Sequence, residues 1–589
     1  MTTMTSGQWV LPIDGSILPD RALIGGKAWS VAHMRSLGLP VPPAFVITTS
    51  ACHAYQASGT VPDELMSEVR NGMQWLEAQT GRRFGAGDAP LLVSVRSGAP
   101  VSMPGMMDTV LNLGMNVQSA AALAAESRDP RFARDTLRRF HEMYADIVLG
   151  SQLPALSEAQ DIPAMSAAIA MHSGNSFPED PMDQLEQAVT AVFDSWNSRR
   201  ARRYRKHHDI SDSLGTAVIV QSMIFGNLDE NSGTGVLFTR NPLTGERHPY
   251  GEYLRQAQGE DVVSGKFTPG SLADMKQLVP DAYDQLLAAG AILEREHAEV
   301  QDIEFTVQQG TLYLLQSRTA KRAPAAAARI AVDMHREGAV TMEQAIARIT
   351  PAQIRSVLSP RLQPGQALDK ATLFSGLGVS PGIGIGRVAT DADSAEQLAR
   401  QGEQVILATS TTSPDDVHGM LVCNAVITES GGSTSHAAVV GRALGLPCVV
   451  GCGPGTVTTL AGQTVTVDGE HGRIYAGQLA VEIPCETQDD RLAELREWAA
   501  KLSPIRVLRR EEAPASTLDL DAFEEAVEPD KLAGLLAGAR GAKGGAIASD
   551  EGVRAALAAG LEYIVAEPSL PPLIAAIHAR AGRIPSDNQ

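Results

Sequence analysis

The sequence predicts an α/β protein built from several domains. The chain has 589 residues, enough for about three to five domains of roughly 100–200 residues each. Its hydrophobic content of 44% supports sizeable cores, and its aromatic content of 4% implies that those cores are mainly aliphatic. Short β-rich runs alternate with helical stretches along the chain, which is typical of domains that mix helices and sheets.

The charge and the cysteines limit the classes of partner and compartment. The net charge is −19, so the chain has no basic excess with which to neutralise nucleic-acid or membrane phosphates, although a local positive site can still hold a small anion. No signal-peptide pattern begins the sequence, and no apolar run reaches about 18 residues. The 5 cysteines form no Cys-x-x-Cys pair, which favours a reducing compartment. We expect a soluble, cytoplasmic protein with no nucleic-acid and no membrane partner.

The first 320 residues are expected to form one large domain. The runs at 91–95 and 217–221 are rich in Val, Leu and Ile and predict strands. Around residues 115–205 glycine is scarce and the pattern predicts helices, which we interpret as an insertion into this domain.

Two runs on either side of residue 310 predict a hairpin with polar groups on one face. Residues two apart on a strand share a face, so Asp302 lies on the side of Glu304, and Gln316 on the side of Arg318. Gln309-Gly310 between the runs is a hairpin turn signal. Carboxylates hold Mg²⁺ through their oxygens, and arginine holds phosphate with two donors. The alternative is a surface hairpin with cross-strand ion pairs.

Other segments in this half have features of phosphate binding. Lys27 follows a Gly-Gly turn that is not a P-loop, because the Gly-x4-Gly-Lys-Ser/Thr pattern is absent. Arg96 stands at the end of a predicted strand. The loop that follows contains Gly105 and Thr109, and a loop of this kind can close over a polyphosphate through its N–H groups.

The middle of the chain predicts a connector and then a compact domain. Residues 321–372 are rich in Ala, Arg and Pro with helical periodicity, and we expect this helical linker to act as a hinge. Residues 373–480 contain many short β runs separated by Gly and Pro, which predicts a small α/β domain.

One histidine in this compact domain is placed for phosphoryl chemistry. Gly431-Gly432 allows a tight turn, and Thr434 or Ser435 can cap the apolar helix that follows. His436 then lies in the first turn, where free N–H groups and the helix dipole favour a bound anion and keep the ring neutral. The alternative is a capped helix whose first turn happens to carry a histidine.

These motifs resemble those of the pyruvate phosphate dikinase and phosphoenolpyruvate synthase family. The run Gly431–Val440 is similar to the family's phosphohistidine motif, with Ser433 where the dikinases usually have Met. Further segments resemble the family's nucleotide-binding part and the opening of its carrier domain: Gly25–Pro43, Ser94–Gly114, Ser232–Glu246, Gln256–Val263 and Gly376–Val388.

The resemblance implies an ATP-grasp nucleotide-binding domain over 1–320 and a swivelling phosphohistidine domain over 373–480. It implies ATP as the nucleotide and Mg²⁺ held by Glu304 and Gln316. It places the phosphoryl group on His436, supported by Gly431, Gly432, Thr434 and Ser435. The residues expected to contact ATP are Lys27, Arg96, Gly105, Thr109, Thr239, Arg240, Asp302, Glu304, Gln316 and Arg318.

The last part of the sequence departs from the family. The family's third part is a β/α barrel of roughly 250 or more residues, and a barrel cannot close from the few units in 481–589. We interpret this region as a truncated barrel remnant or a docking module, with the acidic stretch 511–530 as a solvated linker.

The resemblance implies a dikinase-like, ATP-dependent phosphotransferase. His436 would pass its phosphoryl group to a small-molecule acceptor, either pyruvate on a partner chain or a small hydroxyl compound. A homodimer is compatible with this reading. Whether phosphate or water takes the γ-phosphoryl group stays open. The alternative is a non-catalytic, nucleotide-sensing protein of dikinase type.

Overall fold

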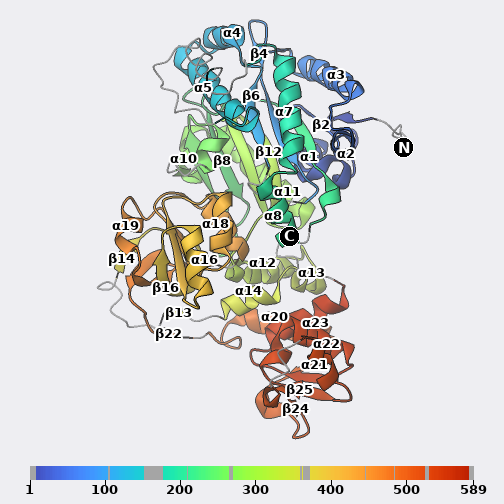
Figure 1. The fold of residues 1–589 in the computed structure, drawn as a ribbon, viewed down its shortest axis with the longest axis vertical. Helices are drawn as coiled ribbons and strands as arrows, with labels where there is room; N and C mark the ends of the chain where they lie inside the picture. The colour runs from blue at the N-terminus through green and yellow to red at the C-terminus, as the bar shows by residue number, and fades with distance from the viewer. Residues whose placement is uncertain are drawn as a thin grey trace.

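The computed structural model arranges the chain as four parts (Figure 1). A large body at one end holds two sheets, a hub of helices lies at the centre, a second sheet domain lies beside the hub, and a small unit lies at the opposite end. The described residues are 8–101, 103, 107–151, 171, 177–208, 210–263, 269–358, 361–362, 372–444, 446–482, 484–523 and 529–582. The α/β multidomain architecture predicted from the sequence is confirmed.

The first sheet of the large body has 5 antiparallel strands in the order β1-β2-β7-β5-β6. The strands expected at 91–95 and 217–221 are present, and every residue of β7 is buried, which explains its unbroken apolar character. The strands are β1 (Val10–Pro12), β2 (Ala44–Ile47), β5 (Val93–Gly98), β6 (Thr109–Leu113) and β7 (Ala217–Ser222).

Helices cover both faces of this sheet. One face packs against α3, α5 and α7, and the other packs against α1. The expected helical insertion is confirmed in its described part as α4, α5, α7 and α8. The helices are α1 (Arg21–Ser36), α2 (Thr49–Ser58), α3 (Asp63–Thr80), α4 (Val117–Ser127), α5 (Pro130–Ile147), α7 (Pro181–Ser195) and α8 (Arg199–His207).

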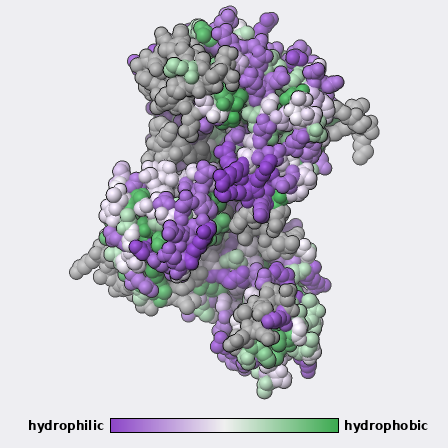
Figure 2. Space-filling view, viewed as in Figure 1, coloured by the Kyte–Doolittle hydropathy of each residue, from purple (hydrophilic) through white to green (hydrophobic). Residues whose placement is uncertain are grey.

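The most hydrophilic surface of the view in Figure 2 lies where Figure 1 places α8. This helix exposes Arg199, Arg202, Arg203 and Lys206 at i, i+3, i+4 and i+7, so the four cations share one face. Its opposite face packs Ala201 and Tyr204 into a small apolar cluster. A local positive surface therefore exists on a strongly acidic chain.

The second sheet of the large body is also antiparallel, in the order β10-β9-β8-β11-β12. The predicted hairpin is confirmed as β11 and β12, and Gln309 and Gly310 in its turn have φ of 52° and 76°. The strands are β8 (Gly233–Phe238), β9 (Tyr250–Arg255), β10 (Gly270–Ser271), β11 (Gln301–Gln308) and β12 (Thr311–Thr319), with α9 (Gly259–Val263), α10 (Leu272–Leu278) and α11 (Pro280–His297).

The register of this sheet arranges polar side chains in rows across it. Glu252 pairs with Val236, which pairs with Glu304, which pairs with Gln316. The next row toward the other strand ends is Tyr250, Phe238, Asp302 and Arg318. Paired residues and residues two apart share a face, so both rows lie on the same side of the sheet. The opposite side is apolar and packs on α1 and α11.

Helices α12 (Pro324–Arg336), α13 (Met342–Ile346) and α14 (Pro351–Val357) form the central hub. Their apolar side chains share one core with residues of α20 and α23 from the C-terminal unit. Within the expected linker 321–372, helices occupy 324–357 and are packed on two sides, against the large body and against α20 and α23. The hinge role of this segment stays a prediction. The two connections to the second sheet domain (residues 372–480), called the carrier domain below after the predicted swivelling domain, pair with each other through Arg361–Leu362 and Val481–Glu482.

The carrier domain has an 8-stranded sheet in the order β14-β21-β20-β16-β17-β18-β19-β15. Strands β16 to β19 are parallel neighbours, and separate apolar clusters pack on its two faces. Its elements are β14 (Thr372–Ser375), β15 (Leu377–Ser380), β16 (Ile383–Ala389), α16 (Ala392–Arg400), β17 (Val405–Thr409), α17 (Val417–Met420), β18 (Ala425–Thr428), α18 (His436–Leu444), β19 (Cys448–Val450), α19 (Thr456–Leu460), β20 (Thr464–Asp468) and β21 (Arg473–Ala476).

The C-terminal unit is an open sheet of 4 parallel strands in the order β23-β26-β25-β24. The expected linker at 511–530 is wrong in its described part, because Leu518 lies in β24 and Leu520 is buried in the core of this unit. The elements are α20 (Asp490–Leu502), β23 (Arg506–Leu508), β24 (Leu518–Asp519), α21 (Pro529–Leu535), β25 (Gly541–Lys543), α22 (Asp550–Ala558), β26 (Tyr563–Val565) and α23 (Leu570–Arg580). Over the described residues, no helix has the length and apolar character that a membrane span requires.

Candidate active site

A kink in α1 brings the first candidate residue into a charged cluster. Gly25 has φ of 74° and ψ of 163°, and a Cβ on it would lie 1.8 Å from the Gly98 carbonyl oxygen, so only glycine allows α1 to approach the end of β5. Gly26 then donates its N–H to the Ala99 carbonyl at 2.9 Å. The Gly-Gly turn therefore fixes Lys27 beside Arg96 on β5.

Side chains from both sheets meet at this point. Arg96 Nη2 donates to Gln316 Oε1 at 3.2 Å and lies 3.4 Å from Glu304 Oε2. Arg318 Nε donates to Asp302 Oδ2 at 2.8 Å. These side chains join the first sheet to the polar face of the second sheet. We call them the charged cluster: Lys27, Arg96, Asp302, Glu304, Gln316 and Arg318.

Burial and the neighbouring charges shift the pKa values of two groups in the cluster, Lys27 and Asp302. Burial and the charge of Arg96 lower the pKa of Lys27 to about 8, with Glu304 acting in the opposite direction. Burial raises the pKa of Asp302, although Arg318 acts in the opposite direction. Its Oδ1 atom has no hydrogen-bond partner among the residues that the structure describes. A cluster of three cations with one unpaired carboxylate oxygen is suited to hold a polyphosphate and its cation.

Of the other residues predicted to contact ATP, the structure places one at the cluster and two away from it. Thr109 is the register partner of Arg96, so it lies at the cluster. Gly105 lies outside the described residues. Thr239 and Arg240 are not brought to the cluster, because the chain has passed the end of β8 and their side chains turn to Glu294 of α11. There Thr239 Oγ1 donates to Glu294 at 2.6 Å, and the buried Arg240 guanidinium also binds Glu337.

The donor set of the cluster fits a magnesium ion in part. Within the described stretches, no three His, Cys, Asp or Glu side chains converge as a metal site. Glu304 and Gln316 are direct register partners and point hard oxygen atoms at one place, where Arg96 now binds them. A Mg²⁺ ion prefers six oxygens, so it would need phosphate or water oxygens in addition to these two residues.

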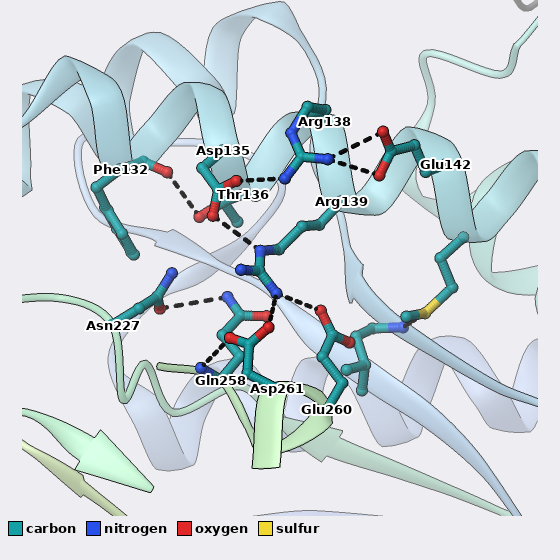
Figure 3. A network of polar contacts seen from close by, with 12 residues as sticks. Phe132, Asp135, Thr136, Arg138, Arg139, Glu142, Asn227, Gln258, Glu260 and Asp261 are labelled. Atoms are coloured by element: carbon teal, nitrogen blue, oxygen red, sulfur yellow. Dashed lines mark hydrogen bonds and ion pairs between the residues drawn. The ribbon is translucent and has the colours of Figure 1, made fainter. Parts of the chain in front are cut away.

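A second polar link, not predicted from the sequence, joins α5 to α9 in the large body. Figure 3 shows Arg139 of α5 between Asp135 of the same helix and the two acids of α9. Arg139 Nη1 lies 2.8 Å from both Glu260 Oε1 and Asp261 Oδ1. The segment 256–263 was recognised as a motif, but its arginine partner stands more than a hundred residues earlier, which no local pattern reveals.

The loop between β18 and α18 positions the candidate phosphohistidine. Gly431 has φ of 121°, and Ser435 Oγ accepts from the Ala438 N–H at 3.4 Å, so Ser435 is the residue that caps α18. His436 is the first residue of the helix, as predicted. Its Nδ1 lies 3.2 Å from Thr412 Oγ1, and its Nε2 is buried with no partner in the described part of the chain.

Burial lowers the pKa of His436, and Asp416 opposes that effect. Burial thus favours the neutral form of the ring, which the sequence predicts from the helix dipole. A neutral ring with a hydrogen bond at Nδ1 leaves the Nε2 lone pair free to act as a nucleophile.

The His436 loop is docked on the large body. Glu252 of β9 accepts from Ser433 N at 2.9 Å, from Ser433 Oγ at 2.5 Å and from Thr434 Oγ1 at 3.0 Å. Gly432 makes this approach possible, because a Cβ on it would lie 2.9 Å from Glu252 Oε1. Thr434, expected as a cap or support, is instead a docking residue. Glu252 lies on the same sheet face as Asp302 and Glu304.

Comparisons with known proteins agree with this division of the chain. A family model described as "Pyruvate phosphate dikinase, AMP/ATP-binding domain" matches residues 21–79 and 56–278. A second model, "PEP-utilising enzyme, mobile domain", matches residues 401–472 and so includes His436.

Curated relatives that match most of the chain are also named pyruvate, phosphate dikinase. The pyruvate, phosphate dikinase of Rhizobium meliloti (strain 1021) is 41% identical over 543 residues, which is 84% of this chain and 60% of that protein. The Clostridium symbiosum enzyme of the same name is 40% identical over 554 residues, or 87% and 62%. Pyruvate, phosphate dikinase 2 of Zea mays is 43% identical over 533 residues, or 85% and 60%. The chain thus spans about three fifths of the length of these relatives.

Proposed function

The chain belongs to the pyruvate, phosphate dikinase family, and from that premise we propose that it is an ATP-dependent phosphotransferase that carries the phosphoryl group on His436. The single observation that supports this most is the docking of the His436 loop against Glu252. Glu252 shares a sheet face with Asp302 and Glu304, so the docked carrier and the charged cluster face the same space.

The cluster is proposed to bind ATP. Lys27, Arg96 and Arg318 bring three positive charges to the polyphosphate, and Thr109 adds a hydroxyl beside Arg96. Arginine binds phosphate with two parallel donors, which positions the phosphoryl chain as well as attracting it. Glu304 and Gln316 would hold Mg²⁺, which when bound would neutralise charge on the phosphates.

His436 is proposed as the nucleophile. A proton on Nδ1, donated to Thr412 Oγ1, leaves Nε2 with its lone pair. Nε2 forms a bond to the β-phosphorus as the bond from that phosphorus to the α-phosphate oxygen breaks, so AMP leaves. The pyrophosphoryl group left on Nε2 then passes its γ-phosphoryl group to phosphate or water as the P–O bond between the β- and γ-phosphorus breaks, which gives pyrophosphate or phosphate and leaves the β-phosphoryl group on His436. A covalent intermediate divides one transfer into two easier steps.

Release of the carrier is proposed to deliver the phosphoryl group. The docked state rests on the hydrogen bonds to Glu252, and the carrier is joined to the hub by the pair of short strands at 361–362 and 481–482. The acceptor is a small molecule, either pyruvate bound on a partner chain or a small hydroxyl compound. The 5 cysteines are all unpaired, which fits a cytoplasmic setting.

A rapid-quench experiment tests the proposal. The purified chain, ATP, Mg²⁺ and phosphate are mixed, and AMP and acid-labile protein phosphate are measured together over a single turnover. We expect the two products to appear in equal amounts in wild type and neither in His436→Asn. A matched control is His418→Asn, which removes an exposed histidine of the same domain and should behave as wild type. AMP formation without protein phosphate would refute the proposal.

A further inference from the structure

Arg442 of α18 is buried at the face of the carrier domain that contacts the large body. Arg442 is only 3% exposed. Nη1 donates to the Ser433 carbonyl at 2.9 Å and to the Val379 carbonyl at 3.4 Å. Nε and Nη2 have no hydrogen-bond partner among the residues that the structure describes. One edge of the guanidinium is therefore used to hold the His436 loop, and the other edge is free.

The free edge is close to the polar face of the second sheet. The Arg442 Cζ atom lies 5.9 Å from the centre of the Phe238 ring. Phe238 is the register partner of Asp302, and both side chains belong to the row that ends in Arg318. The charges of Asp302 and Arg318 both act on Arg442, which places the three groups in one neighbourhood.

A buried guanidinium with a free edge lacks a counter-charge. Leaving a buried donor unpaired is unfavourable, and the penalty is larger for a charged group. The charge of Asp302 acts on Arg442, but no hydrogen bond joins the two side chains in the described part of the chain: Asp302 Oδ2 accepts from Arg318, and Oδ1 has no partner. Lys27 and Arg96 add more positive charge on the other side of the cluster. The missing partner is therefore an anion, and the Nε–Nη2 edge has the geometry that binds two phosphate oxygens.

We propose that Arg442 is a nucleotide-contacting residue that the carrier domain supplies: when the His436 loop is docked, its free Nε–Nη2 edge binds phosphate oxygens of the nucleotide held by the cluster. The ATP site is then completed by a residue from outside the nucleotide-binding half. Nucleotide binding and carrier docking stabilise each other in consequence, because each supplies a partner that the other lacks. This inference rests on the proposed nucleotide site, but not on transfer to His436.

The rival explanation is that Arg442 only holds the Ser433 carbonyl. The two roles are separated by combining Arg442 substitutions with an undocked background, Glu252→Ala. A purely structural role acts on the His436 loop with or without nucleotide, so it predicts that Arg442→Gln also weakens docking in the nucleotide-free protein, which cross-linking of the carrier to the large body measures. A nucleotide contact made across the interface disappears once the carrier is undocked.

The experiment measures the Kd of a non-hydrolysable ATP analogue by calorimetry, with no turnover needed. Arg442→Gln should weaken binding by about 10- to 100-fold in the wild-type background, as expected for loss of a charge-assisted bidentate contact. Arg442→Lys keeps the charge but not the fork, so it should give a smaller loss. Glu252→Ala should itself weaken binding, and adding Arg442→Gln to it should change the Kd by less than about twofold.

The matched control is Arg400→Gln, an exposed arginine of the carrier helix α16, which should leave the Kd unchanged. Wild-type affinity in Arg442→Gln and Arg442→Lys would overturn the inference, and so would an equal loss in both backgrounds. If Arg442→Gln does not fold, Arg442→Lys in the two backgrounds decides the question in the same way. Failure of the proposed function is distinct: His436 would then stay unphosphorylated while the analogue still bound through Arg442.

Discussion

Removal of the Glu252 carboxylate should uncouple the carrier from the nucleotide-binding half. Three hydrogen bonds from Ser433 and Thr434 end on this group, and each involves a charged acceptor. Hydrogen bonds to charged groups contribute roughly 1.5–3 kcal/mol each. Water replaces part of that when the carrier leaves, because Glu252 is not fully buried. We therefore expect Glu252→Ala to shift the docking equilibrium by about 2–4 kcal/mol, or roughly 30- to 700-fold.

A series of substitutions at Glu252 should weaken docking of the carrier by increasing amounts. Glu252→Gln keeps an acceptor oxygen for Ser433 and should lose only about 1–2 kcal/mol. Glu252→Arg adds a repulsive charge to an interface that already contains Arg442, so it should be the most severe. The order of docking should be wild type, then Gln, then Ala, then Arg.

The assay is the single-turnover rate of protein phosphorylation at saturating ATP. We expect the rate to fall in the same order as docking, and the Asp284→Ala control, which removes an exposed carboxylate of α11, to match wild type. A rate within about twofold of wild type in both Glu252→Ala and Glu252→Arg would show that this contact does not position the carrier for transfer.

Three further predictions follow from individual groups. Lys27 has a pKa of about 8 and is charged below it, so nucleotide affinity should fall as the pH rises through about 8, and a pH series of Kd values should lose this inflection in Lys27→Met. Burial lowers the pKa of His141 to about 4, so the stability contributed by its neutral form is complete above about pH 6.5 and is lost as the pH falls to about 4, by about 3 kcal/mol. Hydrogen exchange of α5 between pH 7 and 4 measures this loss, and His141→Phe should remove it. Arg240→Gln leaves Glu294 and Glu337 without their buried partner and should lower the free energy of unfolding by about 3–5 kcal/mol. Nucleotide affinity at low temperature should not change, and a loss of affinity would show that Arg240 contributes to the ATP site.

Local patterns were sufficient to predict the central parts of the site. The alternation of Asp302, Glu304, Gln316 and Arg318, with a turn signal between the pairs, specified a hairpin and its polar face. The cap and the glycine turn specified that His436 begins a helix. Each of these features depends on residues that are close in sequence, so the backbone geometry alone determines them.

Features that depend on distant residues were not predictable in this way. Glu252 meets Ser433 from 181 residues away, and nothing near either residue signals the contact. Helices α12 to α14 were predicted as a helical linker, but their shared core with α20 and α23, more than a hundred residues later, has no signal in the local sequence. Arg240 was placed near phosphate by resemblance, but the strand ends before it and its side chain turns to Glu294.

The position of the transferred phosphorus tests the central claim most directly. The chain is incubated with ATP labelled at the β-phosphorus or at the γ-phosphorus, and label on the protein is mapped by mass spectrometry under conditions that preserve phosphohistidine. The account predicts acid-labile label from the β-position on His436, and none in His436→Asn. Label from the γ-position alone, or label that persists in His436→Asn, would contradict it.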